Sequence, residues 1–179
     1  MRHASIAAIL FLAACGGSTE ENAAKDREAA KATWALVLKV DGADVRIPLG
    51  VMDVTLFKDE DYAKQNPTVF QITGQAFWLF GEIPPANNVG YGENWEKLFG
   101  ATLAVKPSGE FHRDLVTSRI TLPGRTELKI SGGSLQPDAI KGKWTGSEGN
   151  KTLSGKIKLV LEDGKTIEGT FSVHVVSWG

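Results

Sequence analysis

Apolar and polar residues alternate with a period of two along most of the chain from Thr33 onward, which is the pattern of half-buried β-strands. The first such segment, 33–40, carries four apolar side chains on one face: Trp34, Leu36, Leu38 and Val40. The dipeptide Asp41-Gly42 follows as a hairpin turn signal. The apolar phase then shifts by one residue at Gly50, so we expect a β-bulge or a break between two strands there.

The stretch 68–83 is the most apolar part of the chain. We predict one strand over it, at the centre of the core and covered on both faces in its later half. Further strands are expected over 101–105, 111–122 and 126–130, the first two joined by a turn at 107–109. The inward side chains expected within 111–122 are Val116, Ser118, Ile120 and Leu122.

A motif of the form apolar-x-Gly-x-apolar occurs three times in the last third of the chain, at 140–144, 153–157 and 167–171. Its even spacing favours a meander of antiparallel hairpins. Each glycine falls on the apolar face, where glycine marks a bend, a bulge or the close approach of another group. The first copy, Gly142-Lys143-Trp144, is similar to the G-x-W segment of lipocalins and avidins, although in those families it lies near the start of the barrel.

The last hairpin allows a prediction at the level of register. A two-residue turn at Asp163-Gly164 would set inward side chains opposite outward ones, whereas a three-residue loop over 162–164 keeps both apolar faces aligned. We therefore predict positive φ at Gly164, with the Phe171 ring covering Gly155. The predicted pairs are Leu159 with Ile167, Ile157 with Gly169, Gly155 with Phe171, and Leu153 with Val173.

Twenty glycines, and the Val, Thr, Ile and Trp residues spread along the chain, agree with many strands and turns. We predict an all-β fold, either an antiparallel β-sandwich or a partly closed meander barrel, in a single domain over 33–179. The net charge of −1 at pH 7 provides no strong field for nucleic acid.

Sequence signals of catalysis are weak. The chain has no G-x-S-x-G nucleophile elbow. Apart from His3 in the N-terminal segment, its histidines are His112 and His174, and two isolated histidines make a poor metal site. His112 and Asp114 alternate onto one predicted strand face and form a candidate acid–base pair, although a solvated strand face is the favoured interpretation. We expect a protein that is not an enzyme and that holds no metal and no cofactor.

The N-terminus carries a short signal. Met1-Arg2-His3 precedes an apolar run over 4–14, which is too short to span a membrane and is typical of a secretory signal. Leu12-Ala13-Ala14-Cys15 resembles the lipobox of bacterial lipoproteins. The resemblance implies a signal peptide over 1–14 and a lipid (diacylglycerol and an acyl chain such as palmitate) on Cys15, the first residue of the mature chain. A plain secreted protein with an incidental cysteine is the alternative.

The same resemblance indicates a location. Gly16 stands where an aspartate would favour retention in the inner membrane of Gram-negative bacteria, so we expect the outer membrane, with the domain facing the periplasm. The segment 15–32 then forms a tether. It is rich in Ala, Glu, Lys and Arg and has no large apolar residue, so we predict either a partly helical spacer or disorder.

Two stretches are candidate binding surfaces. The long loop over 82–100 combines amides and aromatic side chains that suit recognition: Asn87, Asn88, Tyr91, Asn94 and Trp95. The alternative is a packed loop in which Trp95 and Leu98 seal one end of the core. The second candidate is a basic patch on paired strands, formed by Lys141, Lys143, Lys156 and Lys158; its alternative is a face that confers solubility.

We therefore predict a membrane-anchored lipoprotein whose domain binds a protein, peptide or glycan of the cell envelope. The alternative function is that of a lipocalin-like carrier for a small apolar ligand.

Overall fold

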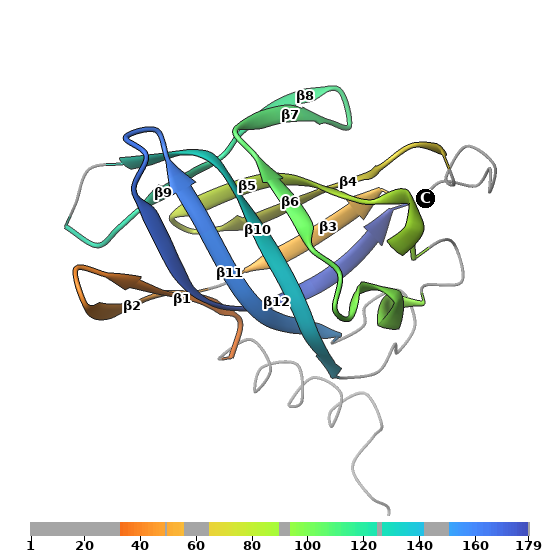
Figure 1. Ribbon diagram of the computed structural model, residues 1–179, viewed down its shortest axis with the longest axis horizontal. Coiled ribbons are helices and arrows are strands. Elements are labelled where there is room, and N and C mark those ends of the chain that lie inside the picture. The colour runs from red at the N-terminus through yellow and green to blue at the C-terminus, as the bar shows by residue number, and fades with distance from the viewer. Residues whose placement is uncertain are drawn as a thin grey trace, which may run out of the picture.

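The computed structural model describes residues 33–48, 50–55, 65–89, 94–124, 127–141 and 151–178. These residues form twelve strands and two short 3-10 helices (Figure 1), which confirms the all-β prediction. In chain order the elements are β1 (Ala35–Val40), β2 (Ala43–Pro48), β3 (Val51–Thr55), β4 (Thr68–Gly74), β5 (Phe77–Ile83), η1 (Pro85–Asn87), η2 (Trp95–Leu98), β6 (Leu103–Lys106), β7 (Ser108–Phe111), β8 (Asp114–Thr117), β9 (Arg119–Thr121), β10 (Glu127–Lys141), β11 (Thr152–Leu161) and β12 (Thr166–Trp178).

Seven strands close into a barrel. The sheet runs in the order β11-β10-β6-β5-β4-β3-β12, and β12 pairs back onto β11. All neighbours in this ring are antiparallel except β12 and β3, which are parallel. The β1–β2 hairpin extends the sheet from the edge of β12, because β1 pairs with its first half and β3 with its second half. The fold is therefore a closed mixed barrel with additional strands.

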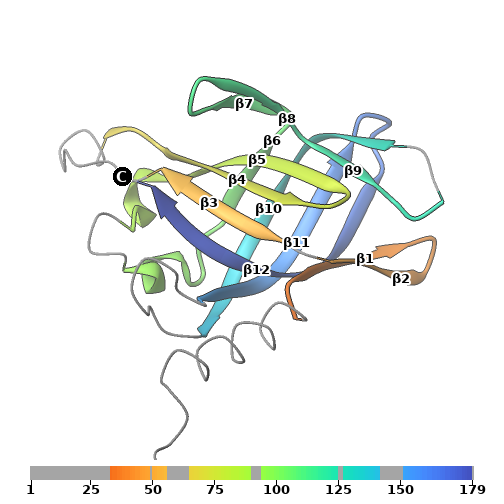
Figure 2. The same ribbon diagram turned by 180° about the vertical axis from the view of Figure 1, so that it is seen from behind.

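One barrel strand is interrupted by an inserted hairpin. Both β6 and β9 pair with β5 on one side and with β10 on the other, and the β7–β8 hairpin lies between them in the chain. The buried Ser118 closes its base: its Oγ donates to the Lys106 carbonyl at 2.6 Å and accepts from the Phe80 amide at 2.9 Å. Figures 1 and 2 both show this hairpin standing out from the barrel wall.

This insertion corrects the strand predicted over 111–122. The hairpin turn lies at His112-Arg113, where both residues have positive φ, and 108–109 belongs to a strand instead of a turn. Val116 packs in a small cluster with Phe80 and Phe111, whereas Ile120 and Leu122 belong to the main core. The predicted inward set therefore divides at Ser118, where the chain returns to the barrel.

The prediction of one strand over 68–83 is also wrong. The segment forms the β4–β5 hairpin with a two-residue turn at Gln75-Ala76, and Gly74 lies opposite Phe77. The turn keeps Phe70 and Ile72 on the same inward face as Phe77 and Leu79, all of them buried. The expectation that the later half is covered on both sides is confirmed, since Phe80 on the outward face is also buried.

The predicted register of the last hairpin is confirmed at all four pairs. Gly164 has φ +81° and its amide donates to the Leu161 carbonyl, which closes a loop over 162–164. Asp163 accepts from the Lys165 amide, and that hydrogen bond, with the Lys165 ammonium, lowers the pKa of Asp163. Gly155 marks the close approach of another group, one of the roles predicted for these glycines: a Cβ there would overlap the Gln136 carbonyl oxygen of β10.

The barrel interior is filled with apolar side chains from every strand of the ring. Trp95, Phe70, Phe171 and Met52 are among the largest that are fully buried, and barrels of about eight strands are just wide enough for side chains to fill. At one end of the barrel, Trp95 and Leu98 of η2 plug the core. We call this the capped end.

Trp34 is buried like the other apolar residues of segment 33–40, although it is not part of the main core cluster. Its ring stacks on His174 with the ring centroids 4.4 Å apart, and its indole nitrogen donates to Thr152 Oγ1 at 2.8 Å. Gly50 proves to be the predicted break between strands, since β2 pairs with β1 and β3 pairs with β4 and β12.

Candidate functional site

The predicted recognition loop closes the barrel. Trp95 is only 2% exposed and Asn88 is also buried, so the structure favours the packed-loop alternative for these two residues. Asn87 donates from its side-chain amide to the Lys97 carbonyl at 2.9 Å, and Asn94 precedes η2 with its side chain exposed. Tyr91 lies outside the described residues. The loop therefore does not bring the predicted residues together on one exposed surface.

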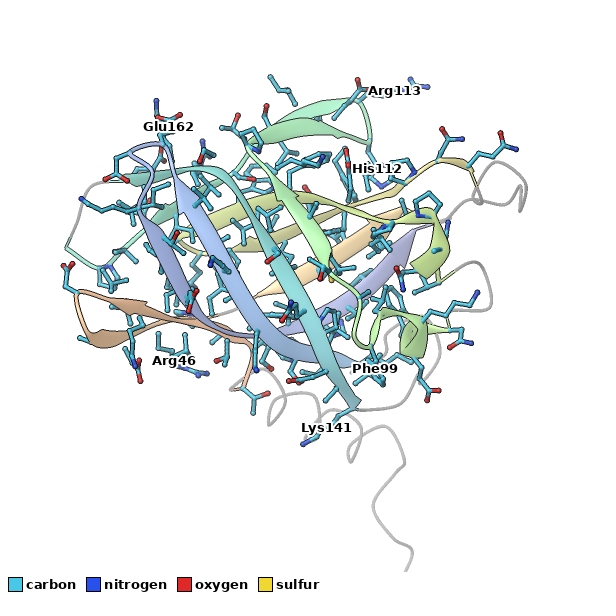
Figure 3. All side chains as sticks on the ribbon, in the orientation of Figure 1. Arg46, Phe99, His112, Arg113, Lys141 and Glu162 are labelled. Carbon is cyan, nitrogen blue, oxygen red and sulfur yellow. The ribbon has the colours of Figure 1, made fainter. Side chains whose placement is uncertain are left out.

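The predicted basic patch is spread out and partly neutralised. Lys156 and Lys158 are exposed on β11, whereas Lys141 ends β10 and pairs with Thr152, four or more residues along β11 (Figure 3). Lys158 forms an ion pair with Glu168 of β12, with Nζ and Oε1 3.2 Å apart. Lys143 and the lipidation candidate Cys15 lie outside the described residues. We refer to the outward side of β10, β11 and β12 as the lysine face.

The candidate acid–base pair does not form on one strand face. His112 occupies the turn of the β7–β8 hairpin with φ +50°, at the projecting tip seen in Figure 3, and Asp114 begins the returning strand. The His112 ring meets the Phe111 ring edge to face at 4.5 Å. Both residues are exposed, so the pair lacks the partly enclosed setting that acid–base chemistry needs.

The structure brings together a different set of side chains, from the adjacent strands β3, β4, β5, β9 and β10. Figure 2 shows β3, β4 and β5 in front. Trp78 donates from its indole nitrogen to Gln71 Oε1 at 2.9 Å, and Gln71 donates from Nε2 to Asp53 Oδ2 at 3.3 Å. On the other side, the Arg119 guanidinium lies 5.9 Å from the centroid of the Trp78 ring. Arg119 Nε is 3.6 Å from Glu127 Oε2. We call these five residues the Trp78 row.

The Trp78 row is rigidly supported. Trp78 packs against the small cluster formed by Phe80, Phe111 and Val116, which the β7–β8 hairpin builds on the outside of β5. At Gly109 of β7 a Cβ would overlap the Phe80 ring, so the glycine allows the hairpin to press onto that ring. The inserted hairpin therefore fixes the outward face of β5, and with it the position of the indole.

Sequence reasoning missed the Trp78 row because it missed the turn at Gln75-Ala76. If 68–83 formed one strand, Trp78 and Phe80 would share a face with Phe70 and Ile72. The turn reverses that phase and places both aromatic residues outside. The signal available in the sequence was the excess of large apolar residues on both faces of 77–80, which required a cover on each side.

The groups that the row presents form hydrogen bonds, ion pairs and apolar contacts. The polar atoms of the row are the carboxylates of Asp53 and Glu127, the Gln71 amide and the Arg119 guanidinium, with no hydroxyl, thiol or imidazole among them. Within the described ranges, no group of three or more His, Cys, Asp or Glu side chains is placed to hold a metal ion. The same part of the chain contains no helix of the length and apolarity required to span a membrane.

Comparison with known proteins does not supply a relative. No family model, no curated protein and no solved structure significantly matches the chain. The function is therefore inferred from the chemistry and geometry of the chain's own residues.

Proposed function

We propose that the protein is a lipid-anchored, non-catalytic binding module of the bacterial cell envelope that recognises its partner with the Trp78 row. One observation carries the proposal. A tryptophan is held on the outside of a barrel whose interior is packed, and hydrogen bonds, an arginine and an inserted hairpin fix it in place. Tryptophan is enriched at interaction surfaces because it combines a large apolar ring with a polar N–H, and a fixed side chain loses little entropy on binding.

The anchor is proposed from the lipobox-like sequence at Cys15, with the domain facing the periplasm from the outer membrane. Two or more acyl chains hold a protein stably to a bilayer, whereas one chain holds it only marginally. In cells fed radioactive palmitate, we expect Cys15→Ser to abolish labelling and to move the chain from the membrane to the soluble fraction. Labelling that persists in the variant would refute the anchor.

The binding surface can be tested in cells with a photo-crosslinking residue. Thr73 lies opposite Trp78 on β4, and Thr166 occupies an exposed position on the lysine face. We expect a crosslinker at Thr73 to capture a discrete partner, and Trp78→Ala to remove that product. The same crosslinker at Thr166 is the control. Equal products from both positions, or a Thr73 product unaffected by Trp78→Ala, would contradict this use of the surface.

A carrier function is the second candidate, and one observation favours it. Trp95 Nε1 and Thr68 Oγ1 are buried without a hydrogen-bond partner, and both lie towards the capped end, in η2 and at the start of β4. Buried polar atoms that lack partners are uncommon and require a water or a ligand. Native mass spectrometry of the Cys15→Ser chain distinguishes the candidates, since a carrier retains a small molecule and a surface-binding module does not.

A further inference from the structure

We infer that the partner of the Trp78 row is a neutral glycan chain, an inference that rests on the surface proposed above. The Trp78 side chain is half-buried, and its N–H is already used by Gln71. The ring therefore contributes apolar contact area, which suits the C–H face of a pyranose ring.

The groups that flank the indole fit vicinal hydroxyls. Asp53, Gln71, Arg119 and Glu127 end in planar groups, each with two or more hydrogen-bonding atoms in a fixed geometry. Their mutual contacts hold these groups in place before a ligand arrives. Neighbouring strands are about 4.8 Å apart, so a row across five strands extends over about 19 Å. That length suits several sugar units in succession.

Charge excludes polyanions. The row contains two carboxylates, Asp53 and Glu127, and one guanidinium, Arg119. A nucleic acid or an anionic lipid surface requires a concentration of positive charge, which a row with a net charge of −1 does not provide. A neutral polyhydroxyl chain has no such requirement.

Strand pairing argues against an extended peptide. A peptide that binds a sheet by main-chain hydrogen bonds needs a free strand edge. Here β4 pairs with β3 and β5, and β5 pairs with β4 on one side and with β6 and β9 on the other. Both edges of each central strand are therefore occupied. Recognition must proceed through side chains, and the side chains present are an aromatic ring and planar polar groups.

The test uses the full mature chain carrying Cys15→Ser. Isothermal titration calorimetry would measure its binding to neutral tetrasaccharides of glucose, N-acetylglucosamine, galactose and mannose, with a heparin tetrasaccharide as the polyanionic probe. We expect saturable binding to at least one neutral probe and none to heparin. Trp78→Ala should weaken that binding at least tenfold, and so should Arg119→Ala, a change at an exposed residue that leaves the packing intact. Lys156→Ala on the lysine face is the matched control and should leave binding unchanged.

Three results would overturn the inference: no binding to any neutral probe, tighter binding to heparin, or binding that neither Trp78→Ala nor Arg119→Ala alters. These results are distinguishable from failure of the proposed surface itself. A Trp78-dependent crosslink from Thr73 to a protein would leave the surface standing and remove only the glycan.

Discussion

The two broad outer sides of this barrel are built from the same kind of strand but differ in what they expose. On the lysine face, seen in front in Figure 1, the outward positions of β11 carry Lys156, Lys158 and small polar residues. On the side of β4 and β5, seen in front in Figure 2, the outward positions carry Trp78 and Phe80. A single residue-to-residue alternation therefore produces a solvated surface on one side and a partly covered aromatic surface on the other.

The two outer sides also differ in whether a second layer of chain covers the barrel wall. The lysine face needs no second layer, because its outward side chains are solvated. The β4–β5 side has the β7–β8 hairpin above Phe80, and the hairpin buries Phe111 and Val116 in doing so. The insertion that interrupts a barrel strand therefore covers the Phe80 ring, while the neighbouring Trp78 indole stays partly accessible.

The largest expected effect comes from removing the covered ring. Phe80 is 3% exposed, and truncating a buried phenylalanine costs about 3–5 kcal/mol. We expect Phe80→Ala to lower the free energy of unfolding by that amount in urea titrations. Lys156→Ala, on the lysine face, should change it by less than about 0.5 kcal/mol. A loss below about 1 kcal/mol for Phe80→Ala would mean that the hairpin does not form a second layer.

Two glycine substitutions test this contrast further. Each should lower the free energy of unfolding by about 1–3 kcal/mol, the usual cost of overpacking. A Cβ at Gly109 would overlap the Phe80 ring, whereas a Cβ at Gly155, on the lysine side, would overlap backbone at Gln136. Phe80→Leu should therefore restore part of the stability lost by Gly109→Ala, which a double-mutant cycle would detect. The Cβ that Gly155→Ala adds overlaps the main chain of Gln136, so Gln136→Ala should restore none of the lost stability. Equal rescue of both glycine variants would contradict the structure.

The smallest expected effect is on the lysine face itself. The side chains of Lys158 and Glu168 are 55% and 67% exposed, and such ion pairs contribute about 0–1 kcal/mol and are screened by salt. We expect Lys158→Ala to lower the melting temperature slightly at low ionic strength and not at all in 0.5 M salt. A salt-independent loss would show that Lys158 contributes by packing and not by charge.

The sequence allowed prediction where alternation and turn chemistry agreed. In the last hairpin, both strands keep strict alternation, and Gly164 supplies the positive φ that the loop needs, so the register followed from the pleat alone. The β4–β5 turn at Gln75-Ala76 offers no such signal, because neither residue is a characteristic turn residue. Because 77–80 carries large apolar side chains on both faces, the alternation of apolar and polar residues does not show the reversal of phase at this turn.

Long-range features were beyond the same reasoning. The closure of the barrel depends on the parallel pairing of β3 with β12, and no local pattern specifies which distant strand is a neighbour. The Trp78 row draws on five strands and depends on the pairing of β5 with β9, which no local pattern specifies either. By contrast, the burial of Trp95 followed one of the two interpretations available from the sequence, that of a plug at the end of the core.

The position of β12 has a consequence for when the molecule can fold. Leu36 lies opposite Phe171 and Val51 opposite His174, so β1 and β3 find their partner only in a strand that is synthesised much later. Contacts this far apart in sequence slow folding, and the ring has no closing strand until β12 has been synthesised. A chain exported as proposed above would thus reach the translocation channel still open and threadable, and would acquire its barrel on the far side of the membrane.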